Sequence, residues 1–484
     1  MTRTRGLLLC ACAVLACTAA GAARAGLDVG VTEDAGKTAD GGVSFFSTLN
    51  DVGLKVNRVS INWDAANPTT IGGQAEIAAW LPQAQTAGTR IIFAVSPQSA
   101  NGLTKPPGTP AQFAAFVAQL ATTFPTVKDY VIGNEPNQPY FWVPQYSDAG
   151  KPLAAAQYLP VLAASYDALK AVDPELEVIG GAVSPAGTDN PTGIRPSHSP
   201  GRFILGMGDA YRAMARTTPI MDAFAFHPYG QRSKSPPSAQ NPNSTRISLA
   251  DYGKLVSFLG QAFDGTGQRG STLPLVYDEY GVQTIPPPAK QSLYTNLDAP
   301  SAADAVSEDE QAAYYRQALQ IAFCQPNVEA FLFFHTVDET DARRWQSGLY
   351  YPDLTPKTSL APVRTAVLEA RRGIVARCPG IQVPVRPLAP VSFPGPRTVS
   401  RQNRDWQVVA GCVQDCGYLV RLERFPGGST TLAGSGILVG GTTNTIRLPA
   451  RRVAPGTYRL TIRLTTRLNP GPALYKVSRP FTVG

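Results

Sequence analysis

Two short apolar runs in the sequence each end in a glutamate. The first run covers Asp129–Glu135, and Pro136 follows it directly. Proline has no N–H to donate to a sheet and is excluded from central strands, so the sequence predicts a strand that stops at Glu135. In parallel α/β folds, functional side chains lie at the carboxyl ends of the strands. We therefore expect Glu135 at a functional edge of a sheet.

The second run, Pro274–Glu279, has the same form and is followed by Tyr280 and Gly281. Two glutamates that each close an apolar strand suggest a pair of catalytic carboxylates. Asp278 is an alternative to Glu279 within this run. Because adjacent strand residues point to opposite faces, we expect only one of the two to line the site, and Tyr280-Gly281 favours Glu279.

Short apolar strands alternate with amphipathic helical stretches from residue 27 to about residue 377, which is typical of a parallel sheet with crossover helices. Eight strands are predicted, at Leu27–Val31, Val56–Asn62, Arg90–Val95, Asp129–Glu135, Glu177–Ala182, Met221–His227, Pro274–Glu279 and Ala330–His335. The helical spacing is clearest at Pro110–Phe124, Ala154–Val172 and Glu308–Phe323. The pattern predicts an α/β fold, a (β/α)8 TIM barrel. An open doubly wound sheet is the alternative, but no G-x-G-x-x-G sequence follows a strand.

The pattern changes after the last helical stretch. A proline-rich connector precedes segments that alternate apolar and polar residues between turns, such as Tyr418–Leu422 and Thr457–Leu464. These segments predict a small all-β, Ig-like sandwich domain. The predicted organisation is a signal peptide at 1–25, a barrel at 26–381, a linker at 382–396 and a β-sandwich at 397–484.

The first 25 residues have the composition of a secretory signal. Arg3 and Arg5 precede the apolar stretch Gly6–Ala20, and Ala23-Arg24-Ala25 fits a cleavage site. We therefore expect a secreted protein with no stable membrane insertion. A lipid attachment at Cys17 is a second reading of this segment.

Cysteine usage agrees with export. Three of the seven cysteines fall in the predicted signal, which leaves Cys324, Cys378, Cys412 and Cys416. Cys412 and Cys416 are close enough to pair locally, which leaves Cys324 to pair with Cys378. The alternative is that Cys324 is a buried apolar thiol. No accompanying spacing suggests a zinc site, and we expect no metal.

Charge is unevenly distributed along the chain. The formal net charge is +8, but residues 382–484 alone carry +11 and the predicted barrel carries −6. A basic tail could contact an acidic polymer, although the simpler reading is that it keeps a small β-domain soluble. No basic motif with interleaved aromatic residues indicates nucleic acid binding.

Several of these residues match a known family. Gly133–Asn137 resembles the strand-four signature of clan A, a large group of retaining barrel glycoside hydrolases that includes cellulases, β-xylosidases and α-L-iduronidase. The resemblance implies that Glu135 is the acid/base and that Glu279 is the nucleophile. It implies that Asn134 binds the sugar 2-OH and that Arg58 lies beside the nucleophile. His227 and Tyr229 match strand-six positions that contact the two carboxylates.

The sequence departs from the family at the end of the eighth strand. The family usually has a tryptophan platform there, whereas this chain has Phe333-Phe334-His335. His335 could bind a sugar hydroxyl instead, or Trp345 could supply the platform. Trp63, Trp142 and Trp345 are candidates for stacking on sugars, and packing roles are nearly as plausible for each.

Each assignment also has a structural alternative. Arg58 could be an ordinary core ion pair, His227 a structural histidine and Glu135 a helix cap. Glu33, Asp34 and Lys37 follow the first strand, and we expect them only to be solvated. The resemblance implies a secreted glycosidase that needs no cofactor, acts as a monomer and takes an oligo- or polysaccharide or glycoside substrate. A non-catalytic carbohydrate-binding protein is the alternative, and the sequence lacks the motifs of serine and metal hydrolases.

Overall fold

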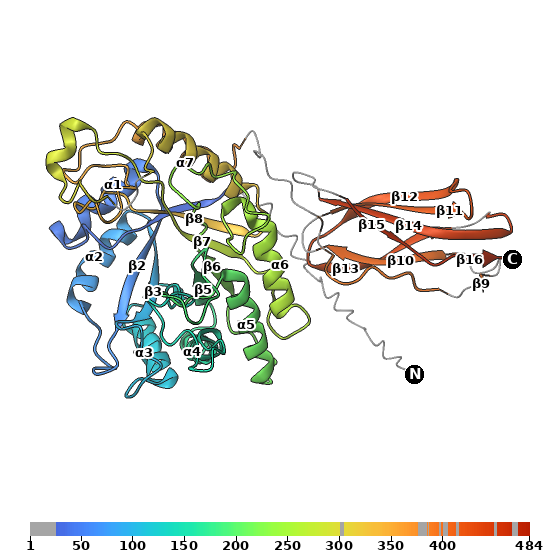
Figure 1. The fold of residues 1–484 in the computed structure, drawn as a ribbon, viewed down its shortest axis with the longest axis horizontal. Helices are drawn as coiled ribbons and strands as arrows, with labels where there is room; N and C mark the ends of the chain where they lie inside the picture. Colours follow the sequence, from blue (N-terminus) through green and yellow to red (C-terminus); the bar gives the residue numbers. More distant parts are fainter. Residues whose placement is uncertain are drawn as a thin grey trace, which may run out of the picture.

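The computed structural model describes residues 26–300, 304–375, 385, 387–395, 398–399, 405–412, 416–449, 453–466 and 473–484. The predicted signal segment and Cys378 lie outside the described residues. Figure 1 shows a barrel surrounded by helices and, beyond it in the sequence, a domain made of strands. No helix among the described residues is long and apolar enough to cross a membrane.

Eight parallel strands close into a barrel in sequence order, which confirms the predicted (β/α)8 fold. The strands are β1 Asp28–Thr32, β2 Val56–Trp63, β3 Arg90–Pro97, β4 Asp129–Ile132, β5 Glu177–Val183, β6 Ala223–Phe226, β7 Leu275–Tyr280 and β8 Val328–Phe334. The α-helices are α1 Val43–Val52, α2 Gln74–Thr86, α3 Pro110–Thr123, α4 Ala154–Val172, α5 Pro200–Ala213, α6 Tyr252–Phe263, α7 Glu308–Phe323 and α8 Leu360–Arg371. Short 3₁₀ helices lie at η1 Ala39–Gly42, η2 Leu249–Asp251 and η3 Pro288–Leu293.

The helices begin where the sequence indicates. Thr109 accepts a hydrogen bond from the backbone N–H of Gln112 and caps α3, whose first residue is Pro110. Ser307 and Glu310 form a capping box at the start of α7. Apolar faces of the helices then pack on the outward-facing side chains of the barrel strands in one continuous core.

The inside of the barrel is filled by a separate, mostly aliphatic cluster with many small side chains, including Ala94, Ala223, Ala225, Val276 and Ala330. Because successive strand residues point to opposite faces, every second residue of a strand contributes to this interior. The next interior position toward the carboxyl end then faces the mouth of the barrel, where the candidate site lies.

The fourth strand is shorter than predicted. It ends at Ile132, and the following backbone is left-handed at Gly133 (φ 85°) and at Glu135 (φ 38°). The N–H groups of these two residues still donate to neighbouring strands, at 2.7 Å to Val95 O and 2.8 Å to Ala182 O. The predicted continuation of the strand to Glu135 is therefore wrong in its backbone conformation, although the segment remains attached to the sheet edge.

The carboxyl-terminal domain has two layers of strands, as predicted for a sandwich. One layer pairs β10 Asp405–Cys412 with β13 Thr442–Pro449. The other contains β9 Thr398–Val399, β11 Cys416–Arg424, β12 Thr430–Leu438, β14 Gly456–Thr466, β15 Leu474–Val477 and β16 Phe481–Val483. Their buried side chains, among them Val408, Val420 and Leu464, form a core of the domain's own.

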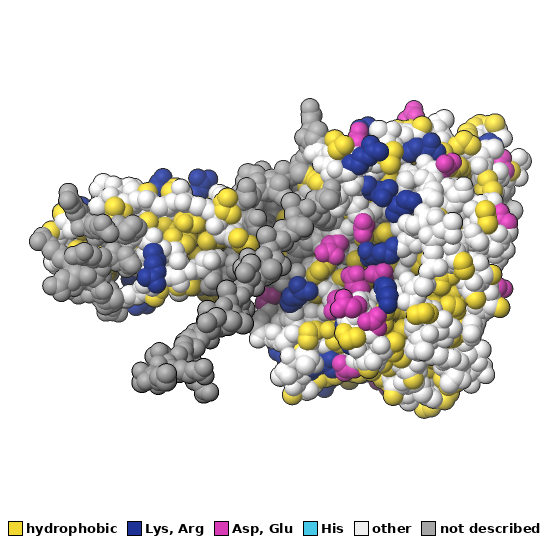
Figure 2. Space-filling model, turned by 180° about the vertical axis from the view of Figure 1, so that it is seen from behind, with side chains coloured by type: hydrophobic (Ala, Val, Ile, Leu, Met, Phe, Trp, Pro, Cys, Tyr) yellow, Lys and Arg dark blue, Asp and Glu magenta, His cyan; other side chains and the backbone are white. Residues whose placement is uncertain are grey.

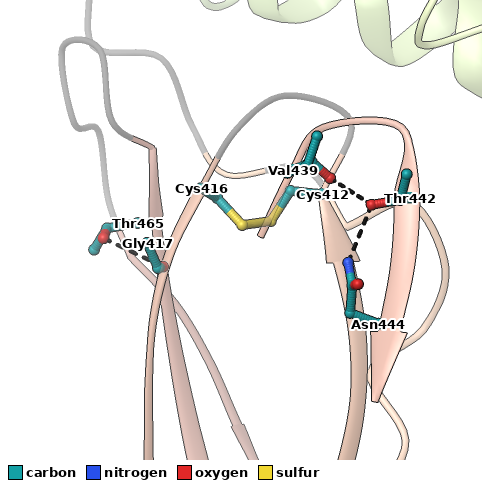
Figure 3. The surroundings of a disulfide bond; sticks show 7 residues. All are labelled: Cys412, Cys416, Gly417, Val439, Thr442, Asn444 and Thr465. Carbon is teal, nitrogen blue, oxygen red and sulfur yellow. Dashed lines mark hydrogen bonds between the residues drawn. A yellow bond between two sulfur atoms is a disulfide. The ribbon is translucent and has the colours of Figure 1, made fainter. Parts of the chain in front are cut away.

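The predicted local disulfide is present. Cys412 at the end of β10 is bonded to Cys416 at the start of β11, so it links the two layers where the chain passes between them (Figure 3). Cys324 is buried and takes part in a disulfide. Its expected partner, Cys378, lies outside the described residues, so that pairing stays a prediction.

Part of the predicted linker lies along the β-domain. Leu388 N–H donates to Gly411 O at 2.8 Å, and Ser392 and Val409 exchange two backbone hydrogen bonds of 3.0 and 2.9 Å. Both contacts are to β10.

On the barrel, acidic side chains gather among lysines and arginines on one face, as Figure 2 shows.

Candidate active site

A cleft of about 1050 Å³ lies at the carboxyl ends of the barrel strands. Its walls contain polar, charged and aromatic side chains from the loops and strand ends around the mouth. They include Glu33, Arg58, Asn134, Glu135, Tyr140, Phe141, Tyr229, Arg246, Glu279, Phe334, His335, Glu339, Arg343, Arg344 and Trp345. Both predicted catalytic glutamates therefore face the same cavity.

Three charged side chains reach the floor of the cleft because of strand alternation. Val56, Ala225 and Val276 belong to the barrel interior, and two residues further along each strand come Arg58, His227 and Asp278. All three are buried. A spacing of two keeps them on the inward face, so they meet on the axis of the barrel beneath the cleft.

Arg58 uses three nitrogens for three partners. Its Nε lies 3.0 Å from Asp278 Oδ2, its Nη1 donates to Glu279 Oε1 at 3.1 Å, and its Nη2 donates to Asn134 Oδ1 at 2.6 Å. Burial lowers the pKa of Arg58, but the carboxylates of Asp278 and Glu279 outweigh burial and raise it overall. The planar guanidinium thus holds β2, β4 and β7 side chains in one fixed arrangement.

His227 contacts three carboxylates, those of Glu135, Asp278 and Glu279. Its Nδ1 lies 2.9 Å from Glu135 Oε1 and 3.3 Å from Glu279 Oε2, and its Nε2 lies 3.3 Å from Asp278 Oδ1. Burial lowers the pKa of His227, yet the negative charges of Glu279 and Asp278 and the hydrogen bonds raise it to about 10. The imidazole is therefore positively charged at neutral pH.

Glu279 is buried among hydrogen-bond donors and charged side chains. Tyr229 O–H donates to its Oε2 at 3.1 Å, beside the contacts from Arg58 and His227. Burial raises the pKa of Glu279, His227 and Arg58 lower it, and Glu135 and Asp278 raise it again. The net direction is upward from the ordinary value of 4.5.

Only one of Asp278 and Glu279 was expected to line the site, and it is Glu279 that lines the cleft, whereas Asp278 lies beneath it. Its carboxylate is fully buried and contacts both Arg58 and His227. The pairing between β7 and β8 is irregular between Tyr277 and Tyr280, which lets Glu279 reach the cleft although Asp278 occupies the inward position. Both acids therefore belong to the site: Glu279 lines the cleft, and Asp278 is buried beneath the cleft floor.

The loop that carries Glu135 is fixed by Asn137. The side chain of Asn137 is fully buried, donates to the carbonyls of Ser184, Ala186 and His198, and accepts from the N–H of Ser184 at 3.0 Å. These contacts join the ends of β4 and β5. Asn137 belongs to the Gly133–Asn137 signature, but the sequence predicted no role for it. The sequence signal that could have indicated this role is the position of Asn137 directly after Glu135-Pro136.

His335 lies at the cleft beside an acid that was expected to be solvated. Glu33 is buried, with its Oε2 3.5 Å from His335 Nδ1 and 3.2 Å from the N–H of Thr336. Lys37 is also buried, donates to the backbone oxygen of Glu33 and lies over the Phe45 ring. The prediction of mere solvation is therefore wrong for Glu33 and Lys37, because the β1 loop folds back over the barrel edge.

The aromatic wall of the cleft is made by Tyr229, Phe334 and Trp345. The Trp345 ring centroid lies 5.1 Å from that of Tyr229 and 5.3 Å from that of Phe334. Phe334 was named only as part of the departing strand-eight sequence, and the structure places its ring in the cleft.

The structure does not bring Trp63 or Trp142 into the cleft. Trp63 is 1% exposed and packs edge-on against Phe113, and Trp142 is 2% exposed and packs against Tyr158. Their indole N–H groups donate to Pro68 O and to Gln157 Oε1. The expectation that they stack on sugars is corrected, because both rings are in the core.

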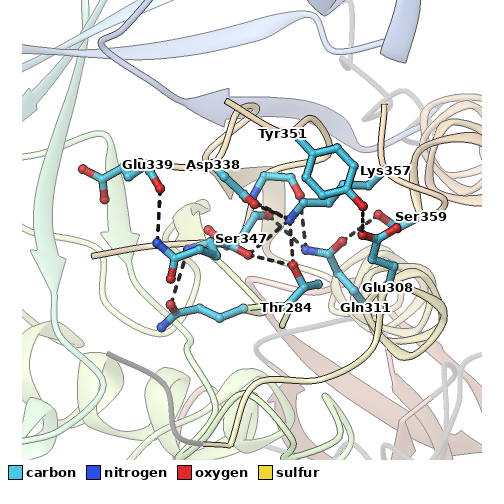
Figure 4. Close-up of polar contacts among 12 residues, drawn as sticks. Thr284, Glu308, Gln311, Asp338, Glu339, Ser347, Tyr351, Lys357 and Ser359 are labelled. Carbon is cyan, nitrogen blue, oxygen red and sulfur yellow. Dashed lines mark hydrogen bonds and ion pairs between the residues drawn. The ribbon is translucent and has the colours of Figure 1, made fainter. Parts of the chain in front are cut away.

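A buried ion pair holds the loop that carries Trp345. Lys357 Nζ lies 2.8 Å from Asp338 Oδ1 and donates to Thr284 Oγ1 at 2.7 Å and to Gln346 O at 3.3 Å (Figure 4). Tyr294 O–H donates to the other oxygen of Asp338 at 2.6 Å. The network joins the loops after β7 and β8 and so fixes the position of that aromatic wall.

The carboxylates of the site are occupied by internal partners. Glu279 and Asp278 both contact Arg58 and His227, and Glu135 contacts His227. Among the described residues, no group of three or more His, Cys, Asp and Glu side chains is arranged to hold a metal ion.

The sequence matches no protein-family model. A search of curated proteins also finds no match. Solved structures are similar in fold. A family 39 glycoside hydrolase from Bacteroides cellulosilyticus WH2 has a TM-score of 0.51 at 16% identity, over 88% of this chain and 81% of that one. A glucosidase from Croceicoccus marinus has a TM-score of 0.51 at 11% identity, over 89% of this chain and 97% of that one. The chain therefore has the fold of these barrel glycoside hydrolases.

Proposed function

We propose that this protein is a secreted, retaining glycoside hydrolase in which Glu279 is the nucleophile and Glu135 is the acid/base. The observation that carries the proposal is that both glutamates contact one atom, His227 Nδ1, at 2.9 and 3.3 Å. The sum of these two distances limits how far apart the two contacting oxygens can be. Because the limit applies to this one pair of oxygens, it is compatible with the roughly 5–5.5 Å that separates the carboxyl groups of retaining enzymes. A short separation supports direct attack by a carboxylate rather than by an interposed water.

The charges of the site support the same division of roles. Two buried cations, Arg58 and protonated His227, face Asp278 and Glu279. These cations favour the charged form of Glu279, which is the form that a nucleophile needs, and the double-displacement reaction then assigns the role of proton donor to Glu135.

The reaction follows from these positions. Glu279 attacks the anomeric carbon while Glu135 gives its proton to the departing glycosidic oxygen, which forms a glycosyl-enzyme ester. Glu135 then takes a proton from water, the water oxygen bonds to the anomeric carbon, and Glu279 leaves as a carboxylate. No cofactor enters this sequence of steps.

Other residues of the cleft have roles in binding. Asn134 is turned toward Arg58 beside Glu135, a place from which its amide can bond the sugar 2-OH. Tyr229 holds Glu279 oriented, and Trp345 with Phe334 offers an aromatic face for a sugar ring. His335 and Glu33 can bond hydroxyls at the same wall. The cleft volume suits an oligosaccharide, and we propose that a monomer acts on it.

The test uses Glu279→Ala and Glu135→Ala with aryl glycosides. We expect Glu279→Ala to lose turnover and to regain it with azide, giving a glycosyl azide of inverted configuration. Glu135→Ala should give azide products of retained configuration with activated leaving groups. Glu76→Ala, an exposed acid at the start of α2, serves as the control. Normal turnover by Glu279→Ala, or an inverted wild-type product, contradicts the mechanism. Saccharide binding by a wild-type protein without turnover indicates the non-catalytic alternative.

A further inference from the structure

Arg246 is a cation of the cleft with no acidic partner among the residues that the structure describes. It lies in the loop between β6 and η2, is half-buried and lines the cavity that contains Glu135 and Glu279. Its side chain forms no hydrogen bond or ion pair with any residue that the structure describes. The other rim arginines differ, since Arg343 is paired with Asp341 at 2.7 Å and Arg344 with Glu339 at 3.3 Å.

The backbone at Arg246 is firmly attached to the barrel. Ile247 N–H donates to Pro185 O at 2.9 Å, and Pro185 itself lines the cleft after β5. Leu249 N–H donates to Pro228 O at 3.1 Å, directly after the strand-six residue His227. Lys254 Nζ donates to the backbone oxygen of Arg246 at 3.3 Å. The guanidinium is therefore presented from a fixed segment at the β5–β6 side of the cleft.

A half-buried guanidinium without a carboxylate is costly. Arginine stays protonated at physiological pH, so it cannot relieve the loss of hydration by releasing its proton. Burial lowers the pKa of Arg246, and within the described part of the chain no acidic neighbour offsets this effect. A partner with negative charge would restore the lost interaction and could bind both guanidinium edges at once.

We propose that the cleft accepts a carbohydrate with a negatively charged substituent and that Arg246 binds this substituent. The ligand is either the carboxylate of a uronic acid or an ester sulfate, because the guanidinium recognises the oxygens that both share. The inference rests on the proposed function only in taking the ligand to be a carbohydrate.

The test measures binding so that it does not depend on turnover. Glu279→Gln serves as the parent protein and is titrated calorimetrically with oligosaccharides of polygalacturonate, alginate and hyaluronan. Each probe is compared with its carboxyl-reduced neutral form, and dextran sulfate is compared with dextran. Arg246→Gln is added to the parent, and Arg212→Gln is the matched control. Arg212 is an exposed arginine on α5 and gives the same change in net charge.

We expect at least one charged probe to bind more tightly than its neutral form. The ratio of the two affinities should fall about 10- to 100-fold in the Arg246→Gln protein, as expected for a lost charge-assisted hydrogen bond, and should stay within about twofold in Arg212→Gln. The class of probe that shows this ratio distinguishes uronate from sulfate.

Three results would overturn the inference. They are no preference for any charged probe, an unchanged ratio in Arg246→Gln, and an equal fall in both variants. A thermal melt of Arg246→Gln establishes that a loss of binding does not come from unfolding. Turnover of neutral glycosides without any charge preference refutes this inference and leaves the proposed function intact. Tighter binding of a charged probe, without wild-type turnover on any glycoside, supports this inference and refutes the proposed function.

Discussion

Arg58 Nε and Asp278 Oδ2 lie 3.0 Å apart, and both side chains are buried beneath the cleft. This contact fixes one edge of the guanidinium. The other nitrogens are then directed to Glu279 and Asn134, so the two residues proposed to act on the sugar share one support. Asp278 is thus a positioning residue for Glu279, the proposed nucleophile, because it acts through Arg58 and His227.

Asp278→Asn should weaken both the fold and the reaction. Removing one negative charge from this buried cluster leaves Glu279 as the remaining carboxylate beside Arg58, and the loss costs about 3 kcal/mol of unfolding free energy. A misplaced Arg58 lowers kcat by about 10- to 100-fold, since displacements of about an ångström are enough to do so. Urea unfolding and steady-state kinetics measure the two effects. Asp209→Asn, an exposed acid on α5, is the control. An unchanged kcat in a correctly folded Asp278→Asn protein would show that Asp278 has no positioning role.

The acidic limb of the pH profile should report Glu279. The carboxylate must be ionised to attack, and its pKa lies above the ordinary value of 4.5 because it is buried near Glu135 and Asp278. kcat/KM should therefore fall as the pH falls through a value above 4.5. His227→Gln removes a positive charge that lowers the pKa of Glu279, so the limb should move to higher pH. A limb that moves to lower pH in this variant contradicts the assignment.

His227 should make the stability of the protein depend on pH in the alkaline range. Its pKa is about 10 in the folded protein against an ordinary 6.5, so the folded state holds the proton more tightly. The resulting stabilisation is complete below about pH 6.5 and is lost as the pH rises through about 10. The difference in unfolding free energy between wild type and His227→Gln, measured in urea at pH 6, 8 and 10, should shrink at each step. A constant difference would mean that the imidazole does not carry the charge.

Lys357→Met tests the support of the aromatic wall. Lys357 and Asp338 are fully buried, so loss of the amine leaves an unpaired carboxylate and should cost about 3–5 kcal/mol. Lys290→Met is the matched control, since Lys290 and Asp353 are also 2.8 Å apart but lie near the surface, where a pair contributes about 0–1 kcal/mol. Chemical denaturation measures both. Similar costs for the two variants would show that burial does not decide the strength of the Lys357 pair.

Much of the site could be predicted because its residues follow strand periodicity. Glu135, His227 and Glu279 each come at or just past the end of an apolar run, and closure of the barrel brings such ends together. Arg58 lies within β2, on the inward face set by alternation from Val56. The same alternation predicted that only one of Asp278 and Glu279 lines the site, and Glu279 does so. The alternation could not reveal the irregular pairing after Tyr277, and both acids contact Arg58 and His227.

The remaining errors concern packing and loops. Trp63 and Trp142 are indistinguishable by sequence from exposed tryptophans near a site, and only their neighbours Phe113 and Tyr158 show that they are core residues. Glu33 and Lys37 were read as solvated because their partners lie in the β8 loop and on α1, far away in sequence or around a turn.

The sequence by itself determined the eight-stranded alternation, the β-domain with its local disulfide and the two glutamates at strand ends, because each depends on contacts between residues near one another in the chain. Only the tertiary structure decided that Glu135, Asp278 and Glu279 share His227, and that Arg246 faces the cleft without an acidic partner in the described ranges. Such charges interact over distances of a few ångströms between strands far apart in sequence, and their pairing is set by barrel closure and loop packing.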